Sequence, residues 1–322
     1  MLRLLSALRR FPIGVRTSLY LTTLAVPRGA LTRAMAGRDG QPAVESDPSL
    51  RDPEFFDQVM DLVELLAERY FRWDFRGAEH VPATGAALLV GNHNGGIVNT
   101  DSLLTLVAVR KQHGPQRAVY SLAHDMVFFD PVLGRVASRI GVLRAGHAAA
   151  SRALDRGDLV LVYPGSDLDT WRPFWHRNRI ELGGRMGFLK LALRQRVPIV
   201  PVVSAGTHEQ MVVLFRGEEF ARKSGLKRHL RAEAFPIMLA VPWGIASGYL
   251  PYLPLPAQTT IAFGKPIRWD DLGPEDAESP EVLGRCYDRV RREMQSLLDT
   301  ITVGRRWMLG QRMKRAPSPP TG

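Results

Sequence analysis

Strand-like and helix-like segments alternate through the middle of this 322-residue chain. Short apolar runs predict buried strands, and these runs cover residues 86–90, 119–122, 141–143, 159–163, 199–203 and 259–263. Apolar residues at helical spacing predict helices over residues 55–71, 102–110, 129–139, 148–155 and 185–194. This alternation predicts an α/β fold with helices on the faces of a sheet. The length suffices for a substantial core, in one large domain or two small ones.

A histidine and an aspartate follow the first of these strands, in the segment Gly91-Asn-His-Asn-Gly-Gly-Ile-Val-Asn-Thr-Asp101. Ligand sites in open α/β sheets gather at the carboxyl ends of strands, where His93 is expected. Asp101 opens the next helical stretch, as an N-cap or a first-turn acid. A histidine that takes a proton from a hydroxyl needs a partner that fixes its tautomer, and Asp101 is the candidate. The same two side chains are also compatible with capping or with a core hydrogen bond.

Positive charge is concentrated at the amino terminus. The formal net charge is +11, and residues 1–38 contain seven arginines and no acidic residue. Leucines alternate with these arginines, which predicts a basic amphipathic segment on an anionic membrane surface; a mobile tail or a targeting leader is the alternative. No nucleic-acid-binding motif accompanies the charge, so nucleic acid is not an expected partner.

We expect residues 1–50 to form this basic segment and a linker, residues 51–310 the main domain, and residues 311–322 a disordered tail.

Residues 234–264 contain no charged side chain, but five prolines interrupt them. A membrane-spanning helix tolerates few such breaks, so we expect a loop or broken helix lying on a bilayer. Trp243, Tyr249 and Tyr252 are of the types that favour the membrane interface. An ordinary buried loop before the strand at 259–263 is the alternative.

The single cysteine, Cys286, permits no intrachain disulfide. It lies in an apolar stripe at helical spacing, which predicts a core position. No metal-ligand spacing of Cys and His appears, so we expect no metal and no other cofactor.

Three further motifs follow in order along the chain. Gly141-Val-Leu-Arg144 ends a strand with an arginine, a good ligand for an anion or head group. Leu159-Val-Leu-Val-Tyr-Pro-Gly-Ser166 is a strand that breaks into a turn, whose backbone amides suit an oxyanion or phosphate. Gly184-Arg-Met-Gly-Phe188 leads a helix towards Val197-Pro-Ile-Val-Pro-Val-Val203.

Together with His93 and Asp101, this ordered set resembles the glycerolipid acyltransferase family, over about residues 75–270. Tyr163-Pro-Gly and the Gly184–Phe188 motif look more like its diacylglycerol-acyltransferase-like branch. Two features depart from the family pattern. Seven residues instead of four separate His93 from Asp101, although Gly95 and Gly96 allow a wider loop, and Gly165 stands where the family has a glutamate.

The resemblance implies a mixed, mostly parallel sheet flanked by helices, and direct acyl transfer to a lipid hydroxyl at the cytoplasmic face of a membrane, with the protein bound peripherally. His93 would be the general base and Asp101 its orienting partner. The donor co-substrate would be acyl-CoA or an acyl carrier protein, and the other partner a membrane lipid. The expected substrate-binding residues are Asn92, Gly95, Gly96, Arg144, Pro164, Gly165, Ser166 and Arg185.

Two other functions remain open from the sequence. The same His–Asp pair suits a lipid thioesterase or esterase, although no Gly-x-Ser-x-Gly elbow of a serine hydrolase is present. A non-catalytic lipid-binding protein is the other. If the protein is an acyltransferase, the missing glutamate and the nearby Asp167 and Asp169 favour a neutral acceptor over a phosphorylated one.

Overall fold

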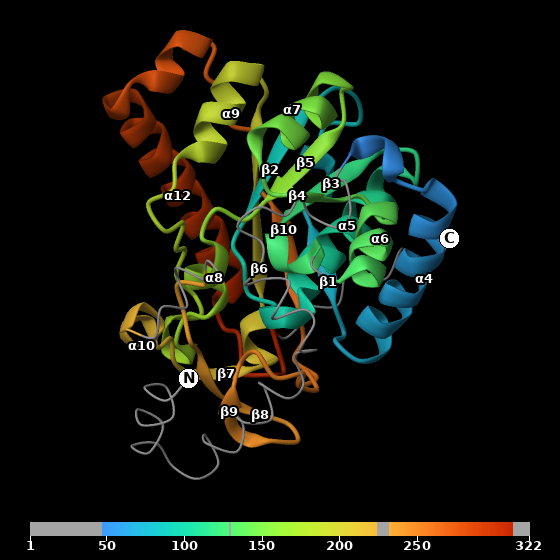
Figure 1. The fold of residues 1–322 in the computed structure, drawn as a ribbon, viewed down its shortest axis with the longest axis vertical. Coiled ribbons are helices and arrows are strands. Elements are labelled where there is room, and N and C mark those ends of the chain that lie inside the picture. Colours follow the sequence, from blue (N-terminus) through green and yellow to red (C-terminus); the bar gives the residue numbers. More distant parts are fainter. Residues whose placement is uncertain (1–46, 129, 224–231, 312–322) are drawn as a thin grey trace, which may run out of the picture.

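A seven-stranded sheet forms the centre of the protein. The computed structural model describes residues 47–128, 130–223 and 232–311, so the basic segment 1–38 and nearly all of the expected tail lie outside the described residues. The strand order is β1-β10-β6-β2-β5-β3-β4 (Figure 1). The strands are β1 (Asp74–Arg76), β2 (Ala87–Gly91), β3 (Val119–Ala123), β4 (Val142–Arg144), β5 (Leu159–Val162), β6 (Ile199–Ala205) and β10 (Thr260–Phe263).

The sheet is mostly parallel, as predicted. Strands β6, β2, β5, β3 and β4 all run in one direction. Strand β10 is antiparallel to β6, and β1 is parallel to β10. Because the five parallel strands share a direction, their carboxyl ends meet at one edge, and the loop that follows β2 places His93 at that edge.

Helices cover both faces of the sheet (Figure 1). On one side are α4 (Pro53–Arg69), α5 (Thr100–His113) and α6 (Pro131–Arg139); on the other are α7 (His147–Asp155), α9 (Gly187–Gln195) and α12 (Pro280–Thr302). Strand β2 serves both layers because successive side chains of a strand point to opposite faces. Its Ala87 and Leu89 pack in the α4–α5 cluster, whereas Leu88 and Val90 pack with α7, α9 and α12.

Local sequence sets the helix ends. Helix α4 begins at Pro53, and the Asp52 side chain accepts a hydrogen bond from Phe55 N at 3.0 Å. Asp101 lies in the first turn of α5, whose N-cap is Asn99. Cys286 is buried on α12, as expected.

Shorter helices connect these elements. Two are α-helical, α8 (Ser166–Thr170) and α10 (Glu218–Lys223). The 3₁₀ turns are Pro48–Leu50, Ala78–His80, Gly96–Val98, Asp125–Phe128, Phe174–His176, Thr207–Glu209 and Pro274–Glu278. Among the helices of the described residues, none is both long and apolar enough to span a membrane.

A second, three-stranded antiparallel sheet lies beside the first. It consists of β7 (Val212–Phe215), β8 (Ile237–Ala240) and β9 (Gly244–Ser247). The expectation of a loop or broken helix in this region is therefore wrong. Along β8, Met238 and Ala240 point inward and Leu239 is half-exposed, which is the two-residue period of a strand. The prolines that interrupt the uncharged segment stand outside the strand bounds.

Candidate active site

His93 and Asp101 are in direct contact. Nδ1 of His93 lies 2.8 Å from Oδ2 of Asp101. His93 lies two residues after β2 and Asp101 lies in the first turn of α5, so the chain between these two fixed elements brings the side chains together across seven intervening residues. The Asp101 side chain is buried, whereas 17% of the His93 side chain remains exposed. The longer spacing is thus compatible with the contact that the resemblance implies.

Asp101 is held as an anion. Burial opposes ionisation of this carboxyl group, but the charge and hydrogen bond of His93 and the amides of Asn94 and Ser102 outweigh it, so its pKa lies below the usual value. Asn94 N donates to Oδ2 at 2.7 Å and Ser102 N donates to Oδ1 at 2.8 Å. The carboxylate therefore has fixed donors on both oxygens and a fixed orientation towards the imidazole.

Tyr163 covers one face of the His93 ring. The two ring centroids are 4.6 Å apart with an angle of 28° between planes. The Tyr163 hydroxyl is buried, and this burial, with the charge of Asp101, raises its pKa well above the usual value. Tyr163 therefore stays neutral and acts as an aromatic wall. Gly91 makes this stacking possible, because a Cβ there would lie 2.4 Å from the tyrosine ring.

The loop between His93 and Asp101 needs both of its glycines. A Cβ on Gly95 would lie 2.5 Å from Thr100 N and 2.7 Å from Asp101 Oδ1. Gly96 has φ +56°, and a Cβ there would lie 2.1 Å from the Tyr252 hydroxyl. That hydroxyl donates to Gly95 O at 3.3 Å, so the segment after β9 closes over the loop. These contacts explain the two glycines without assigning them a substrate.

Asn92 and Asn94 attach the loop to β6. Asn92 Oδ1 accepts from Ser204 N at 2.8 Å, and Asn94 Nδ2 donates to Ser204 O at 2.9 Å and to Ser204 Oγ at 2.8 Å. Both asparagine side chains are buried. Asn92 was expected to bind substrate, but its amide is engaged in the core. Asn94 was not singled out, and its position between His93 and two glycines gave no separate signal.

The turn after β5 is held by hydrogen bonds from the side chain of Arg185. Pro164 and Gly165 are buried, and their carbonyls accept hydrogen bonds from Arg185 Nη1 at 2.9 and 2.7 Å. Arg185 Nη2 also lies 2.5 Å from Glu233 Oε2. Ser166 has φ +49° and opens α8. Arg185, expected to bind substrate, thus holds the shape of this turn.

The structure does not bring Arg144 to His93. Strand β4 is at the edge of the sheet, with β3 and β5 between it and β2. Arg144 Nε lies 2.5 Å from Asp125 Oδ1, which raises the pKa of the guanidinium despite the opposing effect of its burial. Its position at the shared carboxyl edge still allows it to lie beside a long substrate.

Asp169 and Arg172 are closer to His93 than the sequence suggests. Asp169 accepts a hydrogen bond from the His93 amide. The side chain of Arg172, which follows the Trp171 of an aromatic and basic segment, is fully buried in an ion pair with Asp169. Burial lowers the pKa of Arg172 to about 10, so the guanidinium is still charged at neutral pH.

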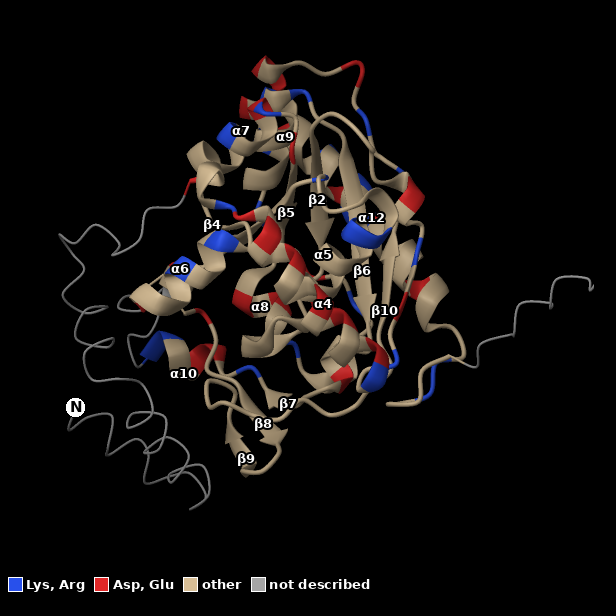
Figure 2. Cartoon of the chain, turned by 90° about the vertical axis from the view of Figure 1, so that its right-hand side faces the viewer, with Lys and Arg blue, Asp and Glu red and all other residues tan. Residues whose placement is uncertain are grey.

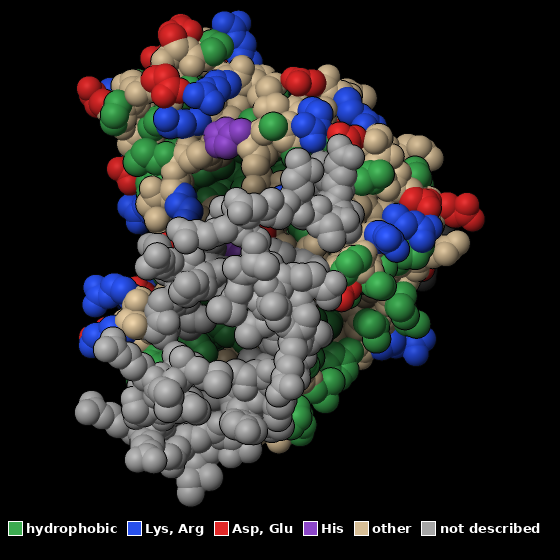
Figure 3. Space-filling model, in the orientation of Figure 1, with side chains coloured by type: hydrophobic (Ala, Val, Ile, Leu, Met, Phe, Trp, Pro, Cys, Tyr) green, Lys and Arg blue, Asp and Glu red, His purple; other side chains and the backbone are tan. Residues whose placement is uncertain are grey.

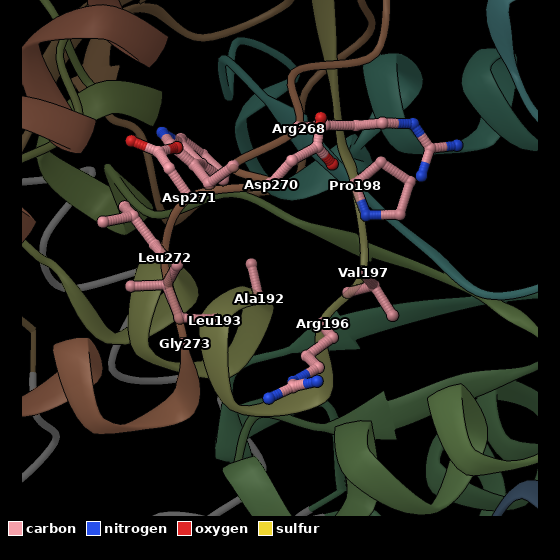
Figure 4. Close-up of a pocket in the computed structure, with 11 residues that line it drawn as sticks. Ala192, Leu193, Arg196, Val197, Pro198, Arg268, Asp270, Asp271, Leu272 and Gly273 are labelled. Carbon is pink, nitrogen blue, oxygen red and sulfur yellow. The ribbon is translucent and has the colours of Figure 1, made fainter.

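A cavity lies at the other end of the sheet. It has a volume of about 400 Å³ and is lined by residues that precede β6, among them Arg196 and Pro198, and by Arg268 and Asp270 (Figure 4). Because these residues come before the amino end of β6, the cavity is remote from His93 and does not form part of the candidate site.

No group of three or more His, Cys, Asp or Glu side chains that could hold a metal ion occurs within the described residues.

Comparison with known proteins identifies the family. The sequence model of the family described as Acyltransferase matches residues 72–205, which include His93, Asp101 and the turn at Pro164. An uncharacterized protein of Mycobacterium tuberculosis is 36% identical over 256 residues, which cover 79% of this chain and 69% of that protein. The chain belongs to the acyltransferase family. This acyltransferase is also 34% identical over 256 residues to an uncharacterized protein of Mycobacterium leprae, covering 79% of this chain and 67% of that protein.

A solved structure was also found. It is the 1-acyl-sn-glycerophosphate (LPA) acyltransferase PlsC from Thermotoga maritima, with 16% sequence identity and a TM-score of 0.45, covering 83% of this chain and 87% of that one. The predicted family membership of this acyltransferase is confirmed. The narrower assignment to the diacylglycerol-acyltransferase-like branch stays a prediction.

Proposed function

We propose that this acyltransferase moves a fatty acyl group from the thioester of acyl-CoA or an acyl carrier protein to the hydroxyl of a membrane lipid, with His93 as the general base. The observation that carries the proposal is the 2.8 Å hydrogen bond between His93 Nδ1 and Asp101 Oδ2. A proton on Nδ1, facing the anionic Asp101, leaves the lone pair on Nε2. The partly exposed ring can then accept a proton from a bound hydroxyl.

The chemistry follows from this tautomer. Nε2 of His93 takes the hydroxyl proton while the hydroxyl oxygen attacks the thioester carbonyl carbon. The resulting oxyanion collapses, the C–S bond breaks, and the leaving sulfur takes the proton back from the imidazolium. Asp101 stabilises that imidazolium, and base catalysis of this kind usually contributes ~10²–10⁴-fold. Amides near Gly95, Gly96 and Gly165 are our candidates for oxyanion donors.

The acceptor we propose is a neutral lipid alcohol. A phosphorylated acceptor needs unopposed cations, but Arg172 and Arg185 near the site, and Arg144 at the edge of the sheet, already contact carboxylates. The pairs are Arg144 with Asp125, Arg172 with Asp169, and Arg185 with Glu233. The sequence argument from the charges of Asp167 and Asp169 needs correction, since Asp169 is turned inward and neutralised by Arg172. The support for a neutral acceptor now comes from these pairs and from Gly165.

We further propose that the second sheet lies on the membrane, as a peripheral contact at its cytoplasmic face. Its outer face, which we call the apolar face, consists of Phe215, Leu239, Val241, Trp243, Ile245 and Leu253, which are 43–64% exposed. Figure 2 shows no charged residue on β8 or β9, and hydrophobic side chains are visible along the lower right-hand side of the molecule in Figure 3. Exposed apolar patches of this kind mark interaction sites.

The reaction class is tested by thiol release from acyl-CoA or acyl carrier protein, with and without a lipid alcohol. Acyl transfer predicts that thiol appears at an appreciable rate only when an acceptor is present, together with acylated lipid. Thiol release and free fatty acid without acceptor would instead identify a thioesterase. Lipid binding without thiol release in any mixture would identify a non-catalytic lipid-binding protein.

The acceptor class is tested with a panel. Diacylglycerol, monoacylglycerol, a long-chain alcohol, lysophosphatidate and glycerol 3-phosphate are offered separately with one donor. We expect higher kcat/KM for the neutral alcohols. Preferred turnover of either phosphorylated acceptor would show that a cation is available to the substrate despite the observed ion pairs, and would overturn the proposed acceptor.

A further inference from the structure

A buried ion pair lies directly behind the candidate base. Asp169 on α8 and Arg172, two residues after its end, both have fully buried side chains. Both side chains of the pair have an exposed fraction of 0%. Burial of two charges is unfavourable unless they are paired and hydrogen-bonded. Their other partners therefore show what the pair holds in place.

Those partners are His93 and Asn94, which begin the segment that leads from His93 to Asp101. The carboxylate of Asp169 accepts the amide N–H of His93, and Arg172 Nη2 donates to Oδ1 of Asn94. Asn94 in turn donates its backbone N–H to Asp101 at 2.7 Å. One ion pair thus contacts the base itself and the residue that orients the partner of the base.

The position of Asp169 also explains Gly165. A Cβ on Gly165 would lie 2.2 Å from the Asp169 Cβ and 2.2 Å from Glu181 O. The space that a side chain at 165 would need is already filled by the Asp169 side chain. A carboxylate is therefore present beneath this turn, delivered from α8 and pointing towards His93.

Charge balance gives the pair a second effect. Asp101 and Asp169 are anionic and Arg172 is cationic, so the described groups around His93 sum to one negative charge. An imidazolium formed at His93 during proton transfer would bring that sum to zero. Loss of the Asp169 charge makes the surroundings of His93 more positive, and loss of the Arg172 charge makes them more negative.

We propose that Asp169 and Arg172 are positioning residues for His93, which fix its backbone and set the charge around its ring. This inference rests on the proposed role of His93 as the base. The titratable groups of the described residues around His93 and this pair are Asp101 on α5, Tyr163 after β5, Asp169 on α8, Arg172, His208 and Tyr252.

Only the two carboxylates and Arg172 carry charge among these neighbours at neutral pH. Burial raises the pKa of the hydroxyl of both Tyr163 and Tyr252. Burial, followed by the charge of Arg172, lowers the pKa of His208 to about 3, so it is neutral. Further out, Glu181 and Arg216 form their own ion pair at 2.6 Å.

Three variants of the full chain test the inference: Asp169→Asn, Arg172→Gln and the double variant. The His93 ring is titrated by NMR in protein labelled with ¹³C at the histidine Cε1 position, and its signal is assigned by its loss in His93→Gln. The acylation rate is measured on the same samples. An unpaired buried charge destabilises a fold more than the loss of both partners, so the double variant is the folding control. Thermal unfolding measures the stability of all three variants.

Asp169→Asn keeps an oxygen that can accept the His93 N–H but leaves Arg172 unopposed, so the midpoint of the His93 titration should fall by about one pH unit. Arg172→Gln leaves Asp169 unopposed, and the midpoint should rise by about one pH unit. The double variant should return towards the wild-type midpoint. Arg172→Gln and the double variant should lower kcat by about 10²-fold with little change in KM, since Asn94 loses its guanidinium.

Wild-type midpoints and kcat in both folded single variants would overturn the inference. Failure of the double variant to fold would also overturn it, because the pair would then serve folding alone. The proposed function fails separately: if the midpoints move as expected while His93→Ala still transfers acyl groups, the positioning of His93 stands and its role as the base does not.

Discussion

At the residue scale, Asp101 provides three fixed contacts that asparagine cannot all reproduce. Its two oxygens accept from His93 Nδ1, Asn94 N and Ser102 N. An asparagine at this position has one acceptor oxygen and an NH₂ group, so either a backbone donor loses its acceptor or the imidazole adopts the other tautomer.

We therefore expect Asp101→Asn to lower kcat by about 10²-fold or more, with a smaller change in KM. Steady-state kinetics of acyl transfer measure this effect. Asp61→Asn is the matched control, because Asp61 makes an exposed ion pair with Arg110 on the surface. Wild-type kcat in Asp101→Asn would mean that the carboxylate does not orient the base.

Individual site residues were predictable where they stand at the end of a regular element. His93 follows an apolar strand and Asp101 opens a helix, so local pattern placed both at one edge of the sheet. The burial of Arg172 could not be predicted, because burial of an arginine depends on partners from other segments, and no local pattern shows that Asp169 and Asn94 surround it. For the same reason the sequence did not show the contacts of Asn92 with Ser204 and of Arg185 with Pro164, and substrate binding by these two residues stays a prediction.

At the element scale, the loop from His93 to Asp101 is held by the segment after β9. The Tyr252 hydroxyl contacts Gly95 O, and Gly96 leaves room for it. Gly96→Ala places a methyl group in the left-handed region of φ and against that hydroxyl, which should displace the loop.

The substitution Gly85→Ala separates the backbone penalty from the steric contact with Tyr252. Gly85 has φ +77° and no atom within 4 Å of a built Cβ, so Gly85→Ala meets only the backbone penalty of roughly 1–2 kcal/mol. We expect Gly96→Ala to lose more unfolding free energy than Gly85→Ala, and to lose acyl transfer as well. Equal urea midpoints and full activity in both variants would show that Tyr252 does not hold the loop.

The central elements could be predicted because their apolar runs are long and regular. The predicted strands at 119–122 and 199–203 correspond to β3 and β6, with bounds shifted by at most two residues. Strands β8 and β9 were missed. The prolines around them hide the alternation that packs Met238 inward and exposes Leu239.

At the scale of the whole molecule, Trp171 connects the second sheet, which carries the apolar face, to the segment that contacts His93. The inner side of the second sheet packs Met238 and Ala240 with Trp171, and Tyr252 packs against the same cluster. Trp171 lies between Asp169 and Arg172 in sequence. Trp171 thus connects the inner side of the second sheet to the chain segment that contains the Asp169–Arg172 pair.

Membrane contact by this face should be insensitive to salt. We expect the double variant Trp243→Ser with Ile245→Ser to float less with anionic vesicles at every salt concentration. Deletion of residues 1–38, which lie outside the described residues, should remove only the binding that fades as salt rises. The control is Leu62→Ser with Leu65→Ser on α4, which alters leucines of similar exposure. Unchanged flotation of the Trp243 variant would contradict the proposed contact.

The most direct test of the account is acyl transfer by His93→Ala, measured as lipid product and thiol from one donor and one neutral lipid alcohol. The control is His113→Ala, which changes a histidine at the opposite end of α5. We predict that both variants fold, that His113→Ala transfers at the wild-type rate, and that His93→Ala loses about 10²-fold or more. Wild-type turnover by a folded His93→Ala would contradict the assignment of His93 as the base.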